Sequence, residues 1–214
     1  MIDPEIANLR QDYNKSGLRR ADVLANPLEQ FNLWLSDALE VGQIEPNAMT
    51  LATVNDSGRP SARMVLLKTV DESGFVFFTN YSSRKGAELA QNPLASLVFW
   101  WDKLERQVRI EGRIEKVSDA DSSEYFQSRP RGSQLGAVAS PQSEVVDTRE
   151  ILEARLSAAE QQYADQDIPR PEHWGGYRLV PDNLEFWVGR RNRLHDRVVY
   201  LRQGDGWALQ RLGA

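Results

Sequence analysis

Residues 105–117 read ERQVRIEGRIEKV, and apolar side chains alternate with polar ones along most of this stretch. Val108, Ile110 and Ile114 fall on one face of an extended chain, and charged or amide side chains occupy the other face. This alternation is typical of an antiparallel strand that covers a core with one face and meets water with the other. The stretch therefore predicts a sheet with one covered face.

Segments on both sides of this strand extend the predicted sheet. Further strands are predicted at 49–54, 62–70, 74–79, 94–101, 176–180, 184–188, 197–202 and 207–212. Helices are predicted at 27–41, 83–91, 119–128, 132–139 and 148–163, and Asn26 is the expected cap of the first. Helices between strands that are distant in sequence favour an α+β class built on a mainly antiparallel barrel. The pattern alone does not separate a barrel from an open sheet.

The composition narrows the classes of function. The net charge of −5 argues against a general nucleic-acid binder, which would usually be basic. The absence of cysteine excludes disulfides, thiolate metal sites and a cysteine nucleophile, and with only two histidines a multi-histidine metal site is not expected. The first residues lack the pattern of a signal peptide, and no apolar run approaches the roughly 20 residues of a membrane span. We therefore expect a cytoplasmic protein with no metal and no nucleic-acid or membrane partner.

Several common catalytic motifs are absent from the sequence. It contains no Gly-x-Gly-x-x-Gly, no Walker-type phosphate loop and no Gly-x-Ser-x-Gly. The sequence therefore gives no support to an oxidoreductase of the dinucleotide-binding fold or to a nucleotide hydrolase.

Two basic segments could bind an anionic ligand. Arg63 and Lys68 have opposite parity in a regular strand, so they could share one ligand only through a bulge, a strand end or a pocket that wraps an edge. They could also be ordinary surface side chains. Residues 82–85, Ser-Ser-Arg-Lys, open a predicted helix, where free N–H groups and two cations would suit a phosphate dianion. The alternative there is a serine cap followed by solvated cations.

A third polar group is spaced four residues apart. Tyr125, Arg129 and Ser133 would share one face of a continuous helix, although Pro130 is expected to break it. Arginine, tyrosine and serine together suit a phosphate, but alone this spacing is a weak signal.

The most distinctive polar group lies near the C-terminus. Arg193 and Arg197 bracket His195, and Trp187 just upstream could pack against a flat aromatic cofactor. A lone histidine is more often structural than catalytic, but the two arginines and the position beside a turn make His195 a candidate. His173 is expected to be structural.

Together and in order, these segments resemble the pyridoxine/pyridoxamine 5′-phosphate oxidases, FMN-dependent flavoproteins that form pyridoxal 5′-phosphate. The resemblance runs from 9 to 212 and is carried by 9–13, 17–20, 63–68, 83–85, 105–108, 128–131, 174–176 and 185–197. It implies a split β-barrel that forms a homodimer with FMN at the subunit interface. The sequence pattern predicts an N-terminal arm over residues 1–25 and a single domain over residues 26–214, and the resemblance implies that this domain binds FMN.

The resemblance further implies a set of site residues. FMN would be held, partly from the second subunit, by Arg63, Met64, Val65, Leu66, Leu67, Lys68, Phe78, Thr79, Arg84, Lys85, Gln107, Gln142, Ser143, Trp187 and Arg197. The substrate would be bound by Arg10, Gln11, Asp12, Tyr13, Lys68, Tyr125, Arg129, Ser133, Arg193, Leu194 and His195. Arg193 and His195 would be the catalytic residues, which orient the substrate and handle its protons.

The implied reaction oxidises pyridoxamine or pyridoxine 5′-phosphate to pyridoxal 5′-phosphate, with FMN as hydride acceptor and O2 reduced to H2O2, in vitamin B6 biosynthesis and salvage. Val188 and the basic loop 189–192 depart from the expected pattern and concern the fine shape of the pocket. One alternative is another split-barrel flavoprotein such as a flavin reductase, which would not need a second phosphate-binding set. The other is a protein that binds flavin or pyridoxal phosphate without turnover.

Overall fold

The computed structural model describes residue 13 and residues 17–214. The contacts of the chain divide it into two compact units. Unit 1 comprises the described part of Met1–Met49 together with Leu97–Glu111 and Pro181–Ala214, and unit 2 comprises Thr50–Ser96 and Gly112–Val180. Each unit is therefore built from segments that are distant in sequence.

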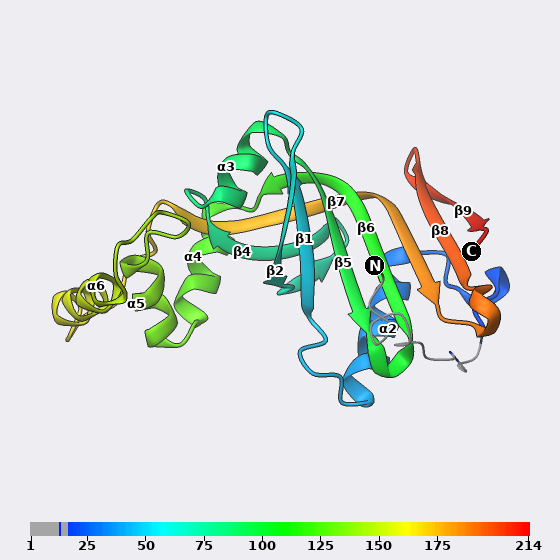
Figure 1. Ribbon diagram of the computed structural model, residues 1–214, viewed down its shortest axis with the longest axis horizontal. Coiled ribbons are helices and arrows are strands. Elements are labelled where there is room, and N and C mark those ends of the chain that lie inside the picture. The colour runs from blue at the N-terminus through cyan, green and yellow to red at the C-terminus, as the bar shows by residue number, and fades with distance from the viewer. Residues whose placement is uncertain (1–12, 14–16) are drawn as a thin grey trace, which may run out of the picture. The chain divides into compact units, whose positions relative to one another are not determined.

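Nine strands in the described residues are joined by hydrogen bonds into one sheet (Figure 1). They are β1 (Ala48–Val54), β2 (Pro60–Leu66), β3 (Thr69–Asp71), β4 (Gly74–Asn80), β5 (Leu94–Trp101), β6 (Arg106–Lys116), β7 (Trp174–Val188), β8 (Asp196–Gln203) and β9 (Gly206–Leu212). The pairing order is β2-β1-β5-β6-β7-β4-β3, and β8 pairs with β7 and β9. The pairs β3–β4, β4–β7, β7–β8 and β8–β9 are antiparallel.

Helices lie before and between these strands in the chain, which confirms the predicted α+β class. They are α2 (Pro27–Glu40), α3 (Arg84–Gln91), α4 (Asp119–Ser128), α5 (Arg131–Ala139) and α6 (Arg149–Gln162). Asn26, Ser83 and Ser118 each accept a hydrogen bond from a backbone N–H of the first turn that follows. Each such cap satisfies an N–H that the helix leaves free and stabilises it by about 1 kcal/mol. These helix starts agree with the predicted ones.

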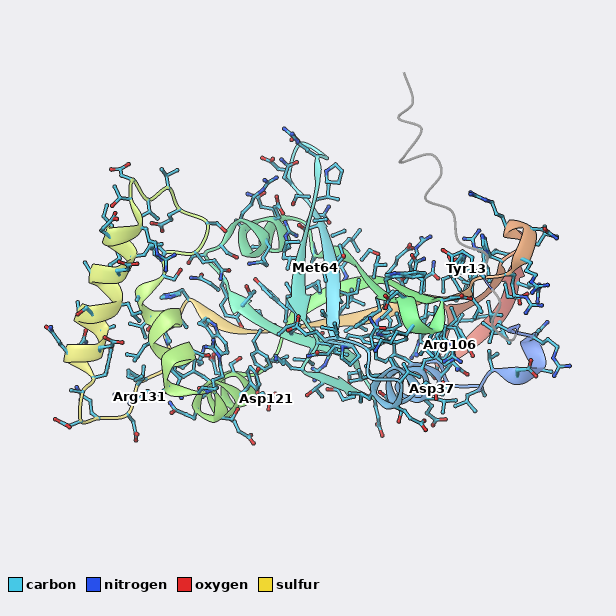
Figure 2. All side chains as sticks on the ribbon, turned by 60° about the horizontal axis from the view of Figure 1, so that its bottom comes forward. Tyr13, Asp37, Met64, Arg106, Asp121 and Arg131 are labelled. Carbon is cyan, nitrogen blue, oxygen red and sulfur yellow. The ribbon has the colours of Figure 1, made fainter. Side chains whose placement is uncertain are left out.

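Helix α2 and the strands of unit 1 form an aromatic core. Phe31 is fully buried, and its ring centroid lies 4.9 Å from that of Phe99 on β5. The guanidinium of Arg106 lies over the ring of Trp34 at 4.5 Å and donates to the Asp37 carboxylate at 2.6 Å (Figure 2). Burying one phenylalanine side chain contributes about 1.5–3 kcal/mol to folding. The buried face of this helix therefore packs against the core.

Unit 2 has its core on β4 and on the helices that follow β6. Phe75 and Phe77 of β4 are fully buried. Helices α5 and α6 lie side by side (Figure 1). A hydrophobic cluster in the helical part comprises Phe126, Leu135, Ala159, Ile168 and Trp174. This packing holds α4 and α5 near the first residue of β7.

Two predicted strand boundaries are wrong. The strand predicted over 62–70 is divided, because β2 ends at Leu66 and β3 begins at Thr69. The strands predicted at 176–180 and 184–188 are one strand, β7, which continues through Pro181. A proline removes only one ladder donor and its fixed φ is compatible with extended backbone, so here it does not end the strand. The division after β2 places Lys68 outside a regular strand, where the parity argument no longer applies.

The helices of the described residues include none that is long and apolar enough to cross a membrane. In the same part of the chain, no group of three or more His, Cys, Asp or Glu side chains could hold a metal ion.

Candidate functional site

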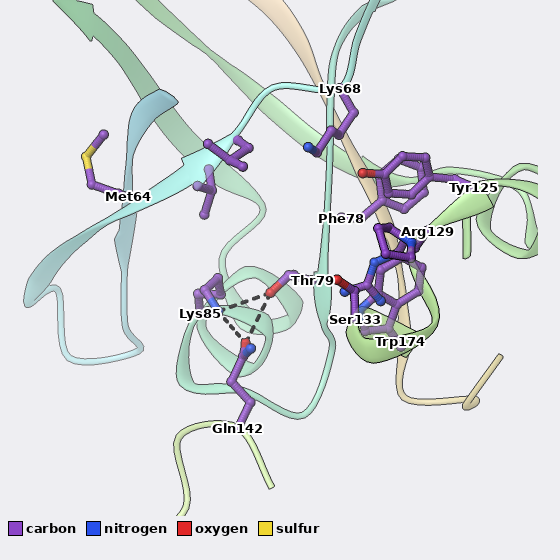
Figure 3. Close-up of a pocket in the computed structure, with 13 residues that line it drawn as sticks. Met64, Lys68, Phe78, Thr79, Lys85, Tyr125, Arg129, Ser133, Gln142 and Trp174 are labelled. Carbon is purple, nitrogen blue, oxygen red and sulfur yellow. Dashed lines mark hydrogen bonds between the residues drawn. The ribbon is translucent and has the colours of Figure 1, made fainter. Parts of the chain in front are cut away.

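Unit 2 contains a cavity of about 450 Å³ (Figure 3). This volume falls within the roughly 300–1,000 Å³ of small-molecule sites. The cavity is lined by Met64, Val65, Leu66, Lys68, Phe78, Thr79, Lys85, Tyr125, Arg129, Pro130, Ser133, Gln142 and Trp174. Except for Pro130 and Trp174, each of these is a residue for which the sequence predicts contact with cofactor or substrate.

One wall of the cavity consists of stacked aromatic rings. The ring of Phe78 lies 4.0 Å from that of Tyr125 with an interplanar angle of 24°. It lies 5.5 Å from that of Trp174 at 13°. Parallel rings present flat apolar faces, and such faces suit a flat aromatic ligand.

A cationic group lies at the aromatic end of the cavity (Figure 3). The Arg129 guanidinium lies 4.7 Å above the Trp174 ring, and its buried Nη1 has no hydrogen-bond partner among the described residues. Burial lowers the pKa of Arg129. Ser133 in the first turn of α5 and Lys68 also line this end. An unpaired buried donor beside a hydroxyl and a second cation is suited to an anionic ligand.

A second cationic group centres on Lys85 and lies apart from the first in the lining (Figure 3). The Lys85 ammonium donates to Thr79 Oγ1 at 3.1 Å, to Ser83 Oγ at 3.2 Å and to Gln142 Oε1 at 2.6 Å. Burial lowers the pKa of Lys85, and the charge of Arg63 lowers it further, to about 8. A negative ligand here would relieve both effects, because it stabilises the charged amine.

The first turn of α3 favours an anion for a second reason. It carries Arg84 and Lys85 and no acidic residue. Cations at a helix N-terminus are opposed by the helix dipole, whereas an anion there is stabilised by it. Gly86 brings this turn against the preceding backbone, because a Cβ at this position would lie 2.0 Å from the carbonyl oxygen of Tyr81. The close approach therefore requires glycine.

Seven residues predicted to hold FMN do not line the cavity, and four of them belong to unit 2. Arg63 and Arg84 both pair with the buried Glu88 of α3, at 3.1 Å and 2.9 Å. Leu67 is buried and is not part of the lining. Ser143, beside Gln142, has a left-handed backbone with φ 74°.

The candidates near the C-terminus form a separate cluster in unit 1. The ring centroid of His195 lies 4.6 Å from that of Trp187 and 5.7 Å from that of Tyr13. The backbone N–H of Arg190 donates to His195 Nδ1 at 3.1 Å. Burial lowers the pKa of His195, and the charge of Arg193 lowers it further. The neutral ring therefore carries its proton on Nε2, which is left as a donor.

The loop before His195 has an unusual backbone. Asn192 and Arg193 both have left-handed φ angles, 57° and 60°. A left-handed backbone costs most non-glycine residues about 1–2 kcal/mol, but asparagine tolerates it, so the strain lies at Arg193. Arg193 and Leu194 are exposed, and Leu194 remains 72% accessible. Strained backbone next to a candidate catalytic residue is consistent with a functional loop.

Arg197 and Gln107 also lie in unit 1. Arg197 on β8 pairs across the strands with Trp187 and binds both carboxylate oxygens of Glu185, at 2.7 Å and 3.0 Å. Hydrogen bonding to Glu185 raises the pKa of Arg197, so this guanidinium stays charged. Gln107 is a half-buried residue of β6.

The position of the Tyr13 ring accounts for the glycine at position 189 in the basic loop 189–192. A Cβ at Gly189 would lie 2.5 Å from Cγ of Tyr13, so the ring packs directly on the glycine backbone. Val188 is 3% exposed and packs in the core, which accounts for an apolar residue there. The remaining predicted arm residues, Arg10, Gln11 and Asp12, lie outside the described residues.

Besides Pro130, Trp174 is a cavity residue that the sequence predictions missed. It is the first residue of β7, and it follows His173, which was expected to be structural. A usable signal was present, because Trp174 stands directly before two glycines at a strand start. Glycine in a strand often marks a close approach, and Gly176 pairs with Phe78 in the antiparallel register.

Two protein-family models match the chain. The model described as pyridoxamine 5′-phosphate oxidase matches residues 35–163. The model described as the pyridoxine 5′-phosphate oxidase C-terminal dimerisation region matches residues 174–213.

Known proteins match over nearly the whole chain. A pyridoxine/pyridoxamine 5′-phosphate oxidase from Thermosynechococcus vestitus is 61% identical over 207 residues, 97% of this chain and 98% of the relative. One from Burkholderia lata is 58% identical over 210 residues, with the same two coverages. The crystal structure of PhzG from Burkholderia lata in complex with tetrahydrophenazine-1-carboxylic acid has a TM-score of 0.89 and 29% identity, and the match covers 95% of this chain and 100% of that one. This likeness confirms the predicted split-barrel fold.

Proposed function

The chain belongs to the pyridoxine/pyridoxamine 5′-phosphate oxidase family, and on this premise we propose that it is an FMN-dependent oxidase that forms pyridoxal 5′-phosphate. The proposed substrates are pyridoxamine 5′-phosphate and pyridoxine 5′-phosphate, with O2 as the final acceptor. The observation that carries the proposal is the cavity of unit 2, which has two separate cationic groups and an aromatic wall. The proposed reaction brings FMN and its substrate together, and each of them carries a phosphate and a flat ring system.

The Lys85 group fits the phosphate of FMN. Lys85 has a depressed pKa, and Arg84 and Lys85 lie at the start of α3, so both gain from a bound dianion. Met64, Val65 and Leu66 at the end of β2 would contact the flavin, with Phe78 and Thr79 of β4. Gln107, Ser143, Trp187 and Arg197 remain proposed FMN contacts from the resemblance alone.

The Arg129 group fits the phosphate of the substrate. Arg129 offers a buried N–H without a partner among the described residues, and Ser133, Tyr125 and Lys68 line the same end of the cavity. Each charge-assisted hydrogen bond to a phosphate stabilises the complex by about 1.5–3 kcal/mol. Trp174 and Tyr125 would then lie beside the pyridine ring.

In the proposed mechanism the protein positions the reactants. FMN, when bound, would supply the hydride acceptor and pass two electrons to O2, which becomes H2O2. Lys85 and Arg129 would hold the two phosphates and so fix the reacting carbon. Arg193 and the Nε2–H of His195 would orient the substrate through donated hydrogen bonds, and solvent would take the proton that its amine or hydroxyl loses. The amine substrate then consumes one water and releases ammonia, whereas the alcohol substrate needs no water.

A homodimer is part of the proposal. The match of residues 174–213 to a dimerisation region supports it. The similarity pattern also favours the pyridoxal phosphate reaction. The chain is 58% identical to the pyridoxine/pyridoxamine 5′-phosphate oxidase of Burkholderia lata and 29% identical to PhzG of the same organism.

The direct test uses the purified protein under air. We expect a yellow flavin spectrum and, on addition of pyridoxamine 5′-phosphate, equal amounts of pyridoxal 5′-phosphate and H2O2. Pyridoxine 5′-phosphate and tetrahydrophenazine-1-carboxylic acid, tested in parallel, separate the substrate classes. Bound flavin without either product would identify a non-catalytic binder, and turnover of the phenazine alone would replace the proposed substrate.

The pH dependence of FMN binding should report Lys85. The charged amine binds the phosphate, so the dissociation constant of FMN is expected to rise above pH 8, by up to about tenfold per pH unit. The effect of rising pH on the stability of the folded protein has the opposite sign. A depressed lysine pKa penalises the folded, cofactor-free protein below pH 8, and the penalty disappears as the pH rises from about 8 towards the ordinary 10.5.

Quenching of flavin fluorescence between pH 6.5 and 9.5 would measure the effect on binding. Lys85→Arg is the control, because arginine stays charged throughout this range. An unchanged pH profile in that variant would remove Lys85 as the titrating group.

A further inference from the structure

Glu88 is a buried carboxylate that the proposed function does not yet use. It lies on α3, and its side chain is only 6% exposed. Its oxygens accept hydrogen bonds from Thr53 Oγ1 at 2.5 Å and from Ser61 Oγ at 2.7 Å. They also accept from Arg63 Nη2 at 3.1 Å and Arg84 Nε at 2.9 Å. A buried charge is tolerated only when it is paired and hydrogen-bonded in this way.

We infer that Glu88 is a positioning residue for the cofactor phosphate, because one buried carboxylate fixes both Arg63 and Arg84 beside Lys85. The inference rests on the proposed function, in which the start of α3 binds the phosphate of FMN. Glu88 itself would not touch the cofactor.

The two arginines have different numbers of donors left. Arg63 donates through Nη1 to Leu51 O and Thr53 Oγ1, and through Nη2 to Ser61 Oγ and Glu88 Oε2. Four of its five N–H groups are therefore engaged, leaving Nε–H.

Arg84 is held by its Nε only, and its side chain is 60% exposed. Its terminal nitrogens make no hydrogen bond to the described residues, so four N–H groups remain for a phosphate. Glu88 thus leaves Arg84 available as the phosphate ligand and keeps Arg63 as a fixed neighbouring charge.

The net charge of Arg63, Arg84, Lys85 and Glu88 is about equal and opposite to that of a phosphate. Arg63, Arg84 and Lys85 contribute three positive charges, and Glu88 removes one, which leaves about +2 against the −1.5 to −2 of a phosphate monoester at neutral pH. Burial raises the pKa of Glu88, but the hydrogen bonds from Thr53, Ser61 and the two arginines lower it to about 2. The carboxylate is therefore present wherever the phosphate is a dianion.

The test compares FMN with riboflavin, which has the same ring system but no phosphate. Glu88→Gln keeps the shape of the side chain and removes its charge. The ratio of FMN affinity to riboflavin affinity should fall by about tenfold in this variant, because Arg84 loses its orientation towards the phosphate. Riboflavin affinity, and the KM for pyridoxamine 5′-phosphate at saturating FMN, should stay within about twofold.

Glu153→Gln is the matched control. Glu153 pairs with Arg149 at the same i, i+4 spacing, but on the exposed surface of α6. The ratio of FMN affinity to riboflavin affinity in Glu153→Gln should equal that of the wild type. Should Glu88→Gln fail to fold, Glu88→Asp keeps the charge on a shorter side chain, and its ratio should fall by about threefold.

Three results would overturn the inference. Equal weakening of FMN and riboflavin would show that Glu88 only maintains the fold. An unchanged ratio in the Glu88 variants would show that it has no role in phosphate binding. A wild-type protein that binds neither flavin would overturn the proposed function as well, so the two failures are distinguishable.

Discussion

Replacing Arg129 by methionine is expected to raise the KM for pyridoxamine 5′-phosphate by at least about 100-fold. The substitution removes two charge-assisted hydrogen bonds to the phosphate, each of about 1.5–3 kcal/mol. Their sum exceeds the roughly 2.7 kcal/mol that corresponds to a 100-fold change. Methionine can still cover the Trp174 ring that the guanidinium covers at 4.7 Å. The phosphate is held equally in the ground and transition states, so kcat at saturating substrate should change by only a few fold.

Steady-state kinetics with FMN in excess would measure this effect. Arg129→Lys restores a positive charge without the planar fork and should recover part of the loss. Arg149→Met, which removes an exposed arginine of α6, serves as the control and should behave as wild type. Loss of FMN from Arg129→Met, or an unchanged KM, would contradict the assignment of Arg129 to the substrate phosphate.

Replacing His195 or Arg193 by alanine is expected to lower kcat by about 100-fold or more, because proton handling by a positioned side chain contributes about 10²–10⁴. FMN should remain bound, since neither side chain is assigned to the cofactor. The hydrogen bond from Arg190 N–H to His195 Nδ1 makes Nε2 the donor of the neutral ring. His195→Gln can donate from its amide near the same place but cannot act as a base.

Single-turnover reduction of the flavin under anaerobic conditions would measure the chemical step directly. Recovery of kcat in His195→Gln would assign a donor role to the ring, and no recovery would assign proton transfer. If both alanine variants kept wild-type kcat and KM, the catalytic assignment of Arg193 and His195 would be wrong.

Local signals in the sequence predicted much of the fold. Caps at Asn26, Ser83 and Ser118 fixed three helix starts, since each offers a side-chain oxygen to free N–H groups. The alternation in 105–117 predicted a strand that the structure places at Arg106–Lys116. Local rules failed at Pro181, where one missing donor does not end a long strand.

The candidate site was predicted only in part, because contacts between distant segments are not local properties. The spacing of Tyr125, Arg129 and Ser133 suggested one helix face. Pro130 was expected to break that helix, and the structure does end α4 at Ser128 and begin α5 at Arg131, yet all three residues line one cavity. Trp174 was missed because its contact with Phe78 joins distant segments, although the two glycines that follow it are a signal of close approach. The division into an arm over 1–25 and one domain over 26–214 stays a prediction.

The lowered pKa of Lys85 also affects its reactivity towards reagents that modify amines. Reagents such as activated esters attack only the free base. At pH 8 about half of Lys85 is in that form, against less than about 1% of a lysine with the ordinary pKa of 10.5. In the cofactor-free protein, mild acylation should therefore mark the cavity before it marks the surface lysines.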